Sequence, residues 1–411
     1  MNKVLTVMLA GGAGERLFPL TRDIAKPAVP FGGNYRVIDI TLSNSINSGL
    51  RKIYILTQYK ALVLNRHIRQ AWNIVSPELG EFIEVLPPTK RVSEHWYRGT
   101  ADAVYQNAQS IEAEGLPYTL ILSADHIYKM NYQYMLDWHV LHGADVTVAT
   151  TQVTPEETSR FGIVEIDSNF RITGFEEKPR ENPARSRFNA EMCSASMGVY
   201  LFSTRALLDV LAEAHGDANT SHDFGKDILP RLVERGHSVY AYDFIDENKK
   251  EVRYWRDIGT LDAYYEANMD LVSVSPVFNL YDEEWPVRTY QPQYPPAKFV
   301  FAEEGRRMGV SINSMICAGC IVSGGRVVNT VLSPGVRVNS YSEVESSILF
   351  HNVNVGRHSR LRRSIIDSGV QLPEGTELGF DVEKDRKKGH IVTPAGIVVV
   401  HRDSPGVNGH F

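Results

Sequence analysis

A repeat of 17 residues in the C-terminal part of the chain restricts its fold more than any other feature. Apolar positions recur at this interval in three successive units, and within each unit they recur every six residues. The 17-residue interval separates Val331-Leu332, Ile348-Leu349 and Ile365-Ile366, and likewise Val336, Val353 and Val370. The six-residue interval separates Leu332, Val338 and Val344; Leu349, Val355 and Leu361; Ile366, Leu372 and Leu378; and, in a looser earlier unit, Ile316, Val322 and Val328.

This pattern is typical of a triangular coil in which each side is one short strand and each rung contributes one inward side chain. We therefore predict a left-handed parallel β-helix of the hexapeptide kind. A single coil of a solenoid cannot bury its apolar residues alone, so successive coils must stack. An antiparallel meander is the alternative, but it does not explain units that superimpose at a fixed interval. The end coils of a solenoid often pair with other chains, which predicts an oligomer.

The sequence pattern differs from Met1 to about Leu271, where apolar strand-like runs alternate with helical patterns. This alternation predicts βαβ units and an α/β fold whose mainly parallel, Rossmann-like sheet is covered on both faces. The expected strands are Val4–Ala10, Lys52–Thr57, Thr119–Ala124, Val146–Thr151 and Met197–Phe202. The expected helices are Tyr35–Asn47, Leu62–Ala71, Ala101–Ala113, Tyr132–His142 and Arg205–Ala214.

A proline-rich segment separates the alternating pattern from the 17-residue repeat. Its prolines are Pro276, Pro286, Pro292, Pro295 and Pro296. We expect a connector that crosses a surface and is held there by Trp285 and Tyr290. The predicted division is therefore an N-terminal α/β domain of residues 1–272, a connector of residues 273–298 and a β-helix domain of residues 299–411.

The composition excludes several classes of protein. A net charge of -6 argues against a general binder of nucleic acids or anionic membranes. No run approaches the ~20 apolar residues of a membrane span, and the N-terminus lacks the features of a signal peptide. The chain has 3 cysteines, too few for a disulfide framework, so we expect a cytoplasmic protein. Cys317 and Cys320 have C-x-x-C spacing, but without a second ligand pair they are interpreted as small residues in a turn.

A glycine-rich loop follows the first expected strand. The segment Gly11-Gly12-Ala13-Gly14-Glu15-Arg16 is neither a Walker A loop nor a good dinucleotide fingerprint, and glycines after a strand are often only a tight turn. Lys26 follows ten residues after Arg16, and Pro27 is expected to end any helix there and to leave the lysine exposed. Bare amides with two cations indicate a cradle for a polyphosphate.

Several segments together resemble the ADP-glucose pyrophosphorylase family, the glucose-1-phosphate adenylyltransferases of bacterial glycogen and plant starch synthesis. The segments are "GGAGERLFPLT", "AKPAVPFGGNYRVIDITLSNSINSG", "WYRGTADAVYQN", "SADHIYKMNY", "FEEKP", "SHDFGKDILP" and "YWRDIGTLDAYYEANMDL". The resemblance covers nearly the whole chain. It implies a nucleotidyltransferase domain before the β-helix, and conversion of ATP and α-D-glucose 1-phosphate into ADP-glucose and pyrophosphate. It also implies Mg²⁺ as cofactor and a homotetramer.

The resemblance implies roles for four catalytic residues. Asp125 follows the run TLILSA, Asp257 lies in Trp255-Arg256-Asp257, and the two would hold Mg²⁺ between the α-phosphate and the departing pyrophosphate. If both face one site, two carboxylates ~4 Å apart repel by roughly 4 kcal/mol at an effective dielectric near ~20, unless a cation lies between them. Arg16 and Lys26 would neutralise the β- and γ-phosphates.

The resemblance also implies the substrate-binding residues. Lys178 would hold the phosphate of glucose 1-phosphate, kept extended by Pro179, and Glu177 would accept hydrogen bonds from sugar hydroxyls. Asp223 either supports the sugar pocket or caps the helix that follows it. The further expected binding positions are Gly11, Gly12 and Gly14 for phosphates, Gly99 and Thr100 beside the base, and Tyr97, Gly162 and Ser196.

Regulation by a phosphorylated metabolite is a further implication of the resemblance. In some bacterial members a lysine precedes the AKPA segment by three residues, whereas this chain has Asp23 there. An acidic residue would repel a sugar bisphosphate, so we expect fructose 1,6-bisphosphate to be a poor activator. The candidate effector-binding residues are Arg22, Arg36, Arg360 and Arg362.

Three alternatives remain at this stage. The chain could use UTP, dTTP or GTP, because the glycine loop is shared by sugar nucleotidyltransferases in general. Its β-helix could carry an acyltransferase, for which His351 and His358 would be candidate bases, although no loop interrupts the repeat. Finally, it could be a non-catalytic regulatory subunit, but such relatives lose the metal aspartate or the phosphate-binding cations, and this chain retains both.

Overall fold

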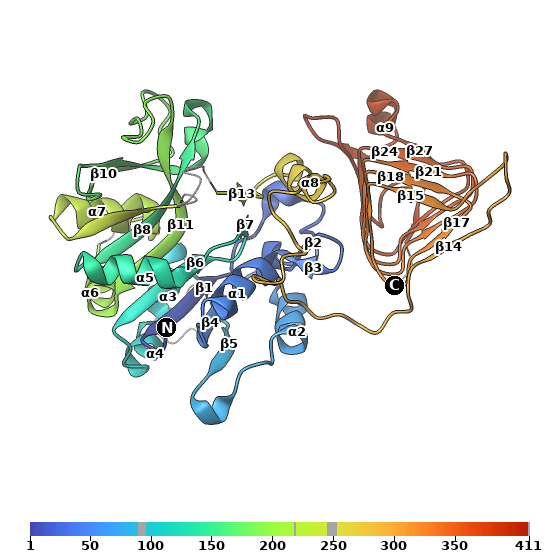
Figure 1. The fold of residues 1–411 in the computed structure, drawn as a ribbon. Helices are drawn as coiled ribbons and strands as arrows, with labels where there is room; N and C mark the ends of the chain where they lie inside the picture. The colour runs from blue at the N-terminus through green and yellow to red at the C-terminus, as the bar shows by residue number, and fades with distance from the viewer. Residues whose placement is uncertain (89–95, 218, 245–252, 410–411) are drawn as a thin grey trace.

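The computed structural model describes residues 1–88, 96–217, 219–244 and 253–409, and shows an α/β domain followed by a β-helix (Figure 1). The main sheet of the α/β domain has the strand order β10-β9-β11-β6-β1-β4-β5, and β8 and β12 extend it beyond β11. These strands are β1 (Val4–Leu9), β4 (Lys52–Leu56), β5 (Phe82–Leu86), β6 (Tyr118–Ser123), β8 (Val146–Val153), β9 (Gly162–Ile166), β10 (Ile172–Glu177), β11 (Cys193–Ser203) and β12 (Val239–Asp243).

The sheet is mixed, with the predicted parallel strands at its core. β1 pairs in parallel with β4 and β6, and β4 pairs in parallel with β5. β11 instead runs antiparallel to both β6 and β8. The reason is the connection that precedes it: the chain enters β11 from the antiparallel pair β9–β10 rather than through a helical crossover, so its direction reverses.

Helices cover both faces of the sheet, as the βαβ pattern predicts. One core packs α1, α2 and α5 on one face, and another packs α3, α4, α6 and α7 on the opposite face. The helices are α1 (Val37–Asn47), α2 (Ala61–Ala71), α3 (Thr100–Gln106), α4 (Ala108–Ala113), α5 (Tyr132–Leu141), α6 (Thr204–His215), α7 (Leu229–Glu234) and α8 (Leu261–Asp270).

Two helices differ from the prediction. The helix expected at residues 101–113 is divided into α3 and α4 at Asn107, whose side chain donates to the carbonyl of Ala103 at 2.8 Å. The first expected helix begins at Val37, because Tyr35-Arg36 is a short strand, β3, paired with β2 (Pro30–Phe31). Arg36 has extended backbone angles and its N–H donates to Asp39, so the helix starts one residue after it.

The connector lies against α1. The Trp285 indole donates to Asn44 Oδ1 at 2.9 Å, which confirms its predicted role as an anchor. The Arg288 N–H donates to Ser43 Oγ at 2.8 Å, and Thr289 donates to the fully buried Asp39 carboxylate at 2.7 Å. Polar side chains on successive turns of α1 thus bind a segment that is distant in sequence.

The C-terminal domain is the predicted parallel β-helix, formed by three stacked sheets (Figure 1). The predicted inward residues from Leu332 to Leu378 are each at most 2% exposed. The strands are β14 (Lys298–Val300), β17 (Ile321–Ser323), β20 (Arg337–Val338), β23 (Asn354–Val355), β26 (Val370–Leu372) and β30 (Asn408–Gly409) in one sheet; β15 (Val310–Ile312), β18 (Arg326–Val328), β21 (Glu343–Glu345), β24 (Arg360–Arg362) and β27 (Glu377–Leu378) in the second; and β16 (Met315–Ile316), β19 (Val331–Leu332), β22 (Ile348–Leu349), β25 (Ser364–Ile366), β29 (Val398–Val400) and β28 (Ile391–Val392) in the third. A short helix, α9 (Val382–Lys387), lies between β27 and β28.

The earliest unit departs from the predicted register by one residue. Val327, not Val328, pairs with Val344 and is fully buried. The preceding turn contains Gly325, where a Cβ would lie 2.8 Å from Val338 Cγ1. The chain crosses this tight turn with one residue fewer than in the later units, so the inward position moves back by one.

The two domains share an apolar core. Tyr264 and Tyr265 of α8 pack with Ile348 and Phe350 of the β-helix. The Tyr265 hydroxyl also donates to the carbonyl of Ser346 at 2.6 Å. Because these contacts are buried, the β-helix holds a fixed face against the α/β domain.

Candidate active site

The glycine loop leaves the carboxyl end of β1, at the sheet edge where open α/β folds bind ligands. Gly14 has a φ of 66°, which favours glycine, and its carbonyl accepts a hydrogen bond from Thr21 Oγ1 at 2.8 Å. A Cβ at Gly14 would lie 2.9 Å from Lys26 Cβ. Lys26 and Thr21 pack directly against the loop and leave no room for a side chain at position 14.

Lys26 lies between two carboxylates. Its Nζ is 2.6 Å from Asp125 Oδ2 and 3.6 Å from Asp257 Oδ1. Contrary to the expectation from Pro27, Lys26 begins a short 3₁₀ helix and is only 7% exposed, because its partners lie inside the site rather than in solvent. Burial alone would lower the pKa of the Lys26 ammonium, but Asp125 and Asp257 hold it above its ordinary value.

Asp125 is held ionised by its neighbours. Burial alone would raise the pKa of its carboxyl group, but Lys26 and His126 hold this pKa well below its usual range. The hydroxyl of Ser123 also donates to Asp125 Oδ1, and His126 Nε2 lies 3.6 Å from the same oxygen. A charged carboxylate therefore persists in a largely buried place.

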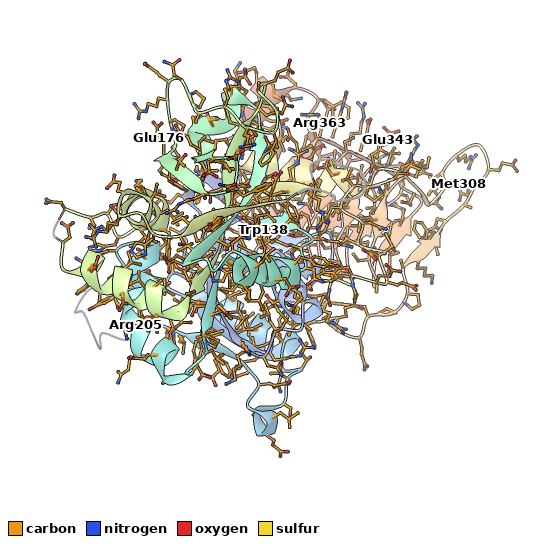
Figure 2. All side chains as sticks on the ribbon, turned by 60° about the vertical axis from the view of Figure 1, so that its left-hand side comes forward. Trp138, Glu176, Arg205, Met308, Glu343 and Arg363 are labelled. Atoms are coloured by element: carbon orange, nitrogen blue, oxygen red, sulfur yellow. The ribbon has the colours of Figure 1, made fainter. Side chains whose placement is uncertain are left out.

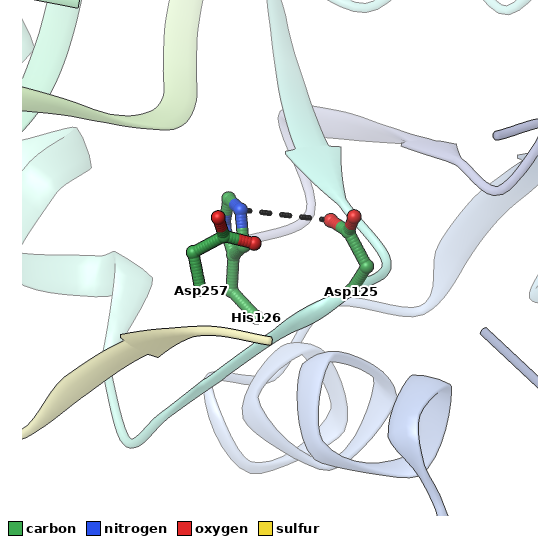
Figure 3. A group of neighbouring side chains, drawn as sticks. All are labelled: Asp125, His126 and Asp257. Carbon is green, nitrogen blue, oxygen red and sulfur yellow. Dashed lines mark ion pairs between the residues drawn. The ribbon is translucent and has the colours of Figure 1, made fainter. Parts of the chain in front are cut away.

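A two-stranded ribbon brings the two aspartates together. β13 (Trp255–Asp257) pairs antiparallel with β7 (His126–Tyr128), and Asp257 is opposite His126. Asp125, His126 and Asp257 point toward one another (Figure 3), and each offers a ligand atom within 4.8 Å of the others. Among the described residues this is the group with the geometry of a possible metal site.

Two arginines approach Asp257 from different elements. A Cβ at Gly259 would lie 2.8 Å from Asp257 Oδ2 and 3.0 Å from Arg16 Nη2, so Arg16 is beside this carboxylate. Arg160, the last residue of the 3₁₀ helix η4 (Pro155–Arg160), has its Nη2 3.6 Å from Asp257 Oδ2. The carboxylates are thus surrounded by the positive charges of Lys26, Arg16 and Arg160.

A cavity of about 400 Å³ opens beside these residues. It is lined by the predicted positions Gly11, Gly12, Tyr97, Gly99 and Thr100, together with Lys26 and Asp125. Gln58 and Tyr59 also line it, and sequence reasoning did not identify them. A Cβ at Gly99 would lie 2.3 Å from the His222 carbonyl oxygen, so this glycine is required by close packing of the backbone.

A second group of predicted residues lies around the Glu177 carboxylate. Gly162 is opposite Glu177 in the β9–β10 pair, and a Cβ at Gly162 would lie 2.8 Å from Glu177 Oε2. Lys178 forms an ion pair with Glu177 and has a φ of 54°. It is therefore left-handed rather than extended: Pro179 restricts it, but its N–H donates to the Phe161 carbonyl at 3.0 Å, and this contact fixes the chain where it leaves β10.

Ser196 lies at an irregularity in β11. The register against β8 shifts between Ser196 and Tyr200, and the Gly198 N–H donates to Ser196 Oγ at 3.3 Å. A Cβ at Gly198 would lie 3.4 Å from His126 Cε1. The bulge therefore turns this part of β11 toward the aspartates, as bulges near functional sites often do.

Asp223 is a capping residue, which is one of the two roles considered for it. Its Oδ1 accepts from the N–H groups of Gly225 at 2.9 Å and Lys226 at 3.2 Å, at the start of a π-helical turn, η5 (Phe224–Ile228). Its Oδ2 accepts from Thr100 Oγ1 at 3.1 Å. The cap therefore also links the segment that supports Glu177 to the wall of the cavity.

The four candidate effector residues do not come together. Arg22 and Arg36 line a cavity of about 280 Å³ between the domains, with Asp23 and Arg402. Arg362 lines a different cavity, beside Tyr265. Arg360 pairs with Glu343 at 3.8 Å and packs over Phe380. Arg360 and Arg362 are close in sequence, but acidic neighbours on the adjacent coils, Glu343 and Glu377, balance the charge of Arg360.

Sequence reasoning missed Arg160 and did not identify His126 as a residue of the site. No motif marks Arg160, whose position depends on where the η4 turn lies relative to β13. Its proximity to the site could not be predicted from spacing. The two cysteines behave as predicted: Cys317 and Cys320 are free and buried. Within the described residues no helix is long and apolar enough to cross a membrane.

Comparisons with known proteins agree with this architecture. The family profile described as "Nucleotidyl transferase" matches residues 5–274, and the profile described as "GlmU-like, C-terminal hexapeptide" matches residues 295–400. A glucose-1-phosphate adenylyltransferase of Koribacter versatilis is 64% identical over 98% of this chain and 96% of its own. One of Rhodopirellula baltica is 54% identical over 98% and 90%, and one of Anaeromyxobacter sp. is 48% identical over 97% and 98%. The chain belongs to the glucose-1-phosphate adenylyltransferase family and is a nucleotidyltransferase.

Proposed function

We propose that this enzyme transfers the adenylyl group of ATP to α-D-glucose 1-phosphate, giving ADP-glucose and pyrophosphate for α-glucan synthesis. The observation that carries the proposal is the convergence of Lys26, Asp125 and Asp257 beside a glycine-lined cavity. The 64% identity to a glucose-1-phosphate adenylyltransferase supports the choice of substrates. The retained cations and carboxylates argue against a non-catalytic subunit.

The triphosphate of ATP is assigned to the glycine loop. The backbone amides of Gly11, Gly12 and Gly14 would cradle it, and Arg16 and Lys26 would neutralise the β- and γ-phosphates. The adenine ring is assigned to the cavity wall at Gly99 and Thr100. Small residues there leave room for a purine, while the side chain of Gln58 offers polar atoms for base recognition.

Mg²⁺ fits the residues present. Asp125 and Asp257 offer hard carboxylate oxygens, which this ion prefers, and His126 lies within 4.8 Å of both. Among the described residues, His126 Nδ1 is a buried polar atom without a hydrogen-bond partner, as a site that takes up a polar ligand would leave it. Bound Mg²⁺ would neutralise charge on the α-phosphate and on the leaving pyrophosphate. Lys26, which bridges the same carboxylates, would then be available to the phosphates.

The sugar phosphate is assigned to the Glu177 region. Glu177 would accept hydrogen bonds from sugar hydroxyls, Lys178 would bind the phosphate, and Gly162 and Ser196 would border the ring. The attacking phosphate oxygen is already ionised, so the reaction needs no base and no protein nucleophile. Positioning and charge neutralisation therefore account for catalysis.

A nucleotide panel tests the proposal. Pyrophosphate release is measured with glucose 1-phosphate and Mg²⁺, using ATP, UTP, dTTP or GTP as the second substrate. Preference for ATP by at least about tenfold in kcat/KM is the expected result. A preference for another nucleotide would assign the chain to a different sugar nucleotidyltransferase activity, and no release with any nucleotide would favour a regulatory subunit.

We further propose that fructose 1,6-bisphosphate activates this enzyme poorly. Asp23 lies in the interdomain cavity with Arg22 and Arg36, and its carboxylate pairs with Arg402. A bisphosphate entering there would meet a negative charge and would have to displace it. A saturating titration that stimulates activity tenfold would contradict this proposal.

The remaining assignments are also proposals. The boundaries 1–272, 273–298 and 299–411 are proposed on the ground that α8 ends at Asp270 and β14 begins at Lys298, and limited proteolysis would test them. A homotetramer in the cytoplasm follows from the family resemblance. Light scattering coupled to size exclusion would measure the mass of the assembly.

A further inference from the structure

Arg160 is a cation at the active site for which the mechanism above has no use. We propose that Arg160 binds the phosphate of glucose 1-phosphate, opposite Lys178, and so helps to orient the attacking oxygen. The inference rests on the proposed function, because it concerns the same sugar phosphate. It adds a phosphate-binding residue that neither the glycine loop nor the FEEKP segment contains.

The position of Arg160 places it between the two halves of the site. It ends the η4 turn, directly before Phe161, whose carbonyl accepts the Lys178 N–H at 3.0 Å. On its other side its guanidinium lies beside Asp257, 3.6 Å from Oδ2 and 3.5 Å from the backbone carbonyl. Two consecutive residues therefore contact the two halves of the site: Phe161 binds the backbone of Lys178, and Arg160 lies beside the carboxylate of Asp257.

The contacts of Arg160 leave its guanidinium able to receive a ligand. Both contacts to Asp257 are long, and its side chain remains 39% exposed, whereas Asp257 is 13% exposed. Exposed ion pairs of this kind contribute little to stability. The guanidinium also packs over the Phe161 ring, with Cζ 5.2 Å from the ring centroid. Stacking on Phe161 thus holds the guanidinium in place, while no close salt bridge occupies its N–H donors.

The charge balance of the site favours a phosphate as the ligand. Asp257 already has Lys26 Nζ at 3.6 Å and Arg16 beside it, so it does not require Arg160 as a counter-ion. Lys178, in contrast, is paired with Glu177, which reduces its charge toward a ligand. A sugar phosphate bears two negative charges at neutral pH, and a guanidinium presents the forked donors that match two phosphate oxygens.

The sugar phosphate is favoured over the triphosphate by the placement of the other cations. Arg16 and Lys26 are on the side of the glycine loop, which is assigned to the β- and γ-phosphates. Arg160 is followed by Gly162, which packs against Glu177 in the β9–β10 pair. Arg160 therefore lies on the segment that leads into β9, on the side of the site that is assigned to the sugar.

The test compares Arg160→Gln and Arg160→Lys with the wild type. We expect Arg160→Gln to raise the KM for glucose 1-phosphate by about tenfold to about a hundredfold, as loss of a hydrogen bond to a charged group does, while the KM for ATP changes less than about twofold. Arg160→Lys keeps the charge but loses the fork, so its KM should be intermediate. Calorimetric titration with ADP-glucose, which retains this phosphate, should show the same order of affinities without turnover.

Arg205→Gln is the matched control. Arg205 lies on α6 at the outer edge of the α/β domain (Figure 2) and its side chain is 87% exposed, so the variant removes one positive charge far from the site. It should keep wild-type constants. If Arg160→Gln lowered only kcat, or the Mg²⁺ affinity, with an unchanged KM for glucose 1-phosphate, Arg160 would merely position Asp257 and the inference would be wrong. An equal rise in the KM for ATP would also overturn it. Failure of the proposed function itself would appear in the wild type, as absence of ADP-glucose formation.

Discussion

The β-helix and the active site gather their key side chains in opposite ways. In the β-helix, each inward residue packs on its equivalent in the next coil, as Val344 does on Leu361 and Leu361 on Leu378. In the active site, Lys26 pairs with Asp125 at a separation of 99 residues, and Asp257 reaches them through a strand ribbon. One region repeats a local rule, and the other depends on the meeting of distant segments.

This difference predicts that substitutions in the two regions affect different properties, stability in one and the reaction rate in the other. A β-helix residue contributes apolar packing, so its loss lowers stability and leaves the chemistry unchanged. A site residue contributes charge at a position fixed by other elements, so its loss lowers the rate and leaves the fold largely unchanged. The following predictions, ordered by the free energy at stake, test whether that separation holds.

The largest effect is expected inside the β-helix. Leu361 is 1% exposed and is enclosed by the coils on either side, so Leu361→Ala removes buried methyl groups and leaves a cavity. We expect the free energy of unfolding to fall by about 2–5 kcal/mol, measured as a lower melting temperature in calorimetry. The KM values should stay as in the wild type. The outward neighbour Arg360→Ala is the control, and a rate loss in Leu361→Ala greater than that in the control would show that the regions are coupled.

The converse effect is expected at the metal-binding position. Asp125→Asn removes one charge from a site whose neighbours Lys26 and His126 are arranged around it. Turnover should fall by about a hundredfold or more, judging by the loss of single charge-stabilising groups. Circular dichroism and the melting temperature should change little. If the variant unfolded instead, the carboxylate would be a structural element and the proposed separation of roles would be broken.

The stability of the α/β domain should depend on pH, because its core contains the buried His139. Burial lowers the pKa of His139 to about 4 in the folded state, against 6.5 in the unfolded chain. The folded state thus prefers the neutral ring, and the free energy of unfolding should decrease as the pH falls from about 6.5 toward about 4, by up to roughly 3 kcal/mol. Urea titrations across this range would measure it. The same slope in His139→Gln would assign the pH dependence to other groups.

The smallest effect is expected at the clasp between the domains, defined here as the pairs Arg22–Asp403 and Asp23–Arg402. All four side chains are at least 38% exposed, so each pair should contribute only about 0.2–1 kcal/mol. A double-mutant cycle with Asp23→Asn and Arg402→Gln would measure the coupling. A coupling above about 2 kcal/mol would mean that the clasp, and not the shared apolar core, holds the domains together.

Much of the fold could be predicted because it follows from local rules. The 17-residue repeat predicted the β-helix and its inward residues, and only the glycine-containing turn before Val327 shifted the register. Alternating strands and helices predicted the α/β domain. The antiparallel direction of β11 could not be predicted, because it depends on the β9–β10 pair that precedes it.

The candidate site was predictable only where a motif marks it. The glycine loop, Lys26 and the two aspartates were identified from their segments, whose resemblance to a known family supplied roles that spacing alone does not give. The extended conformation predicted for Lys178 was wrong, since the preference before a proline was overridden by a hydrogen bond to Phe161. Arg160 was missed because the sequence around it is an ordinary charged turn.

The sequence by itself determined the periodic parts of this protein: the coils, the covered sheet and the bare loop after the first strand. Apolar burial repeats with the geometry of the backbone, so spacing along the chain is sufficient to specify it. Only the tertiary structure decided which charges meet: that Lys26 lies between Asp125 and Asp257, and that Arg160 faces the same place. Electrostatic contacts depend on distance in space, and that distance is set by how the elements pack rather than by the sequence separation between the residues.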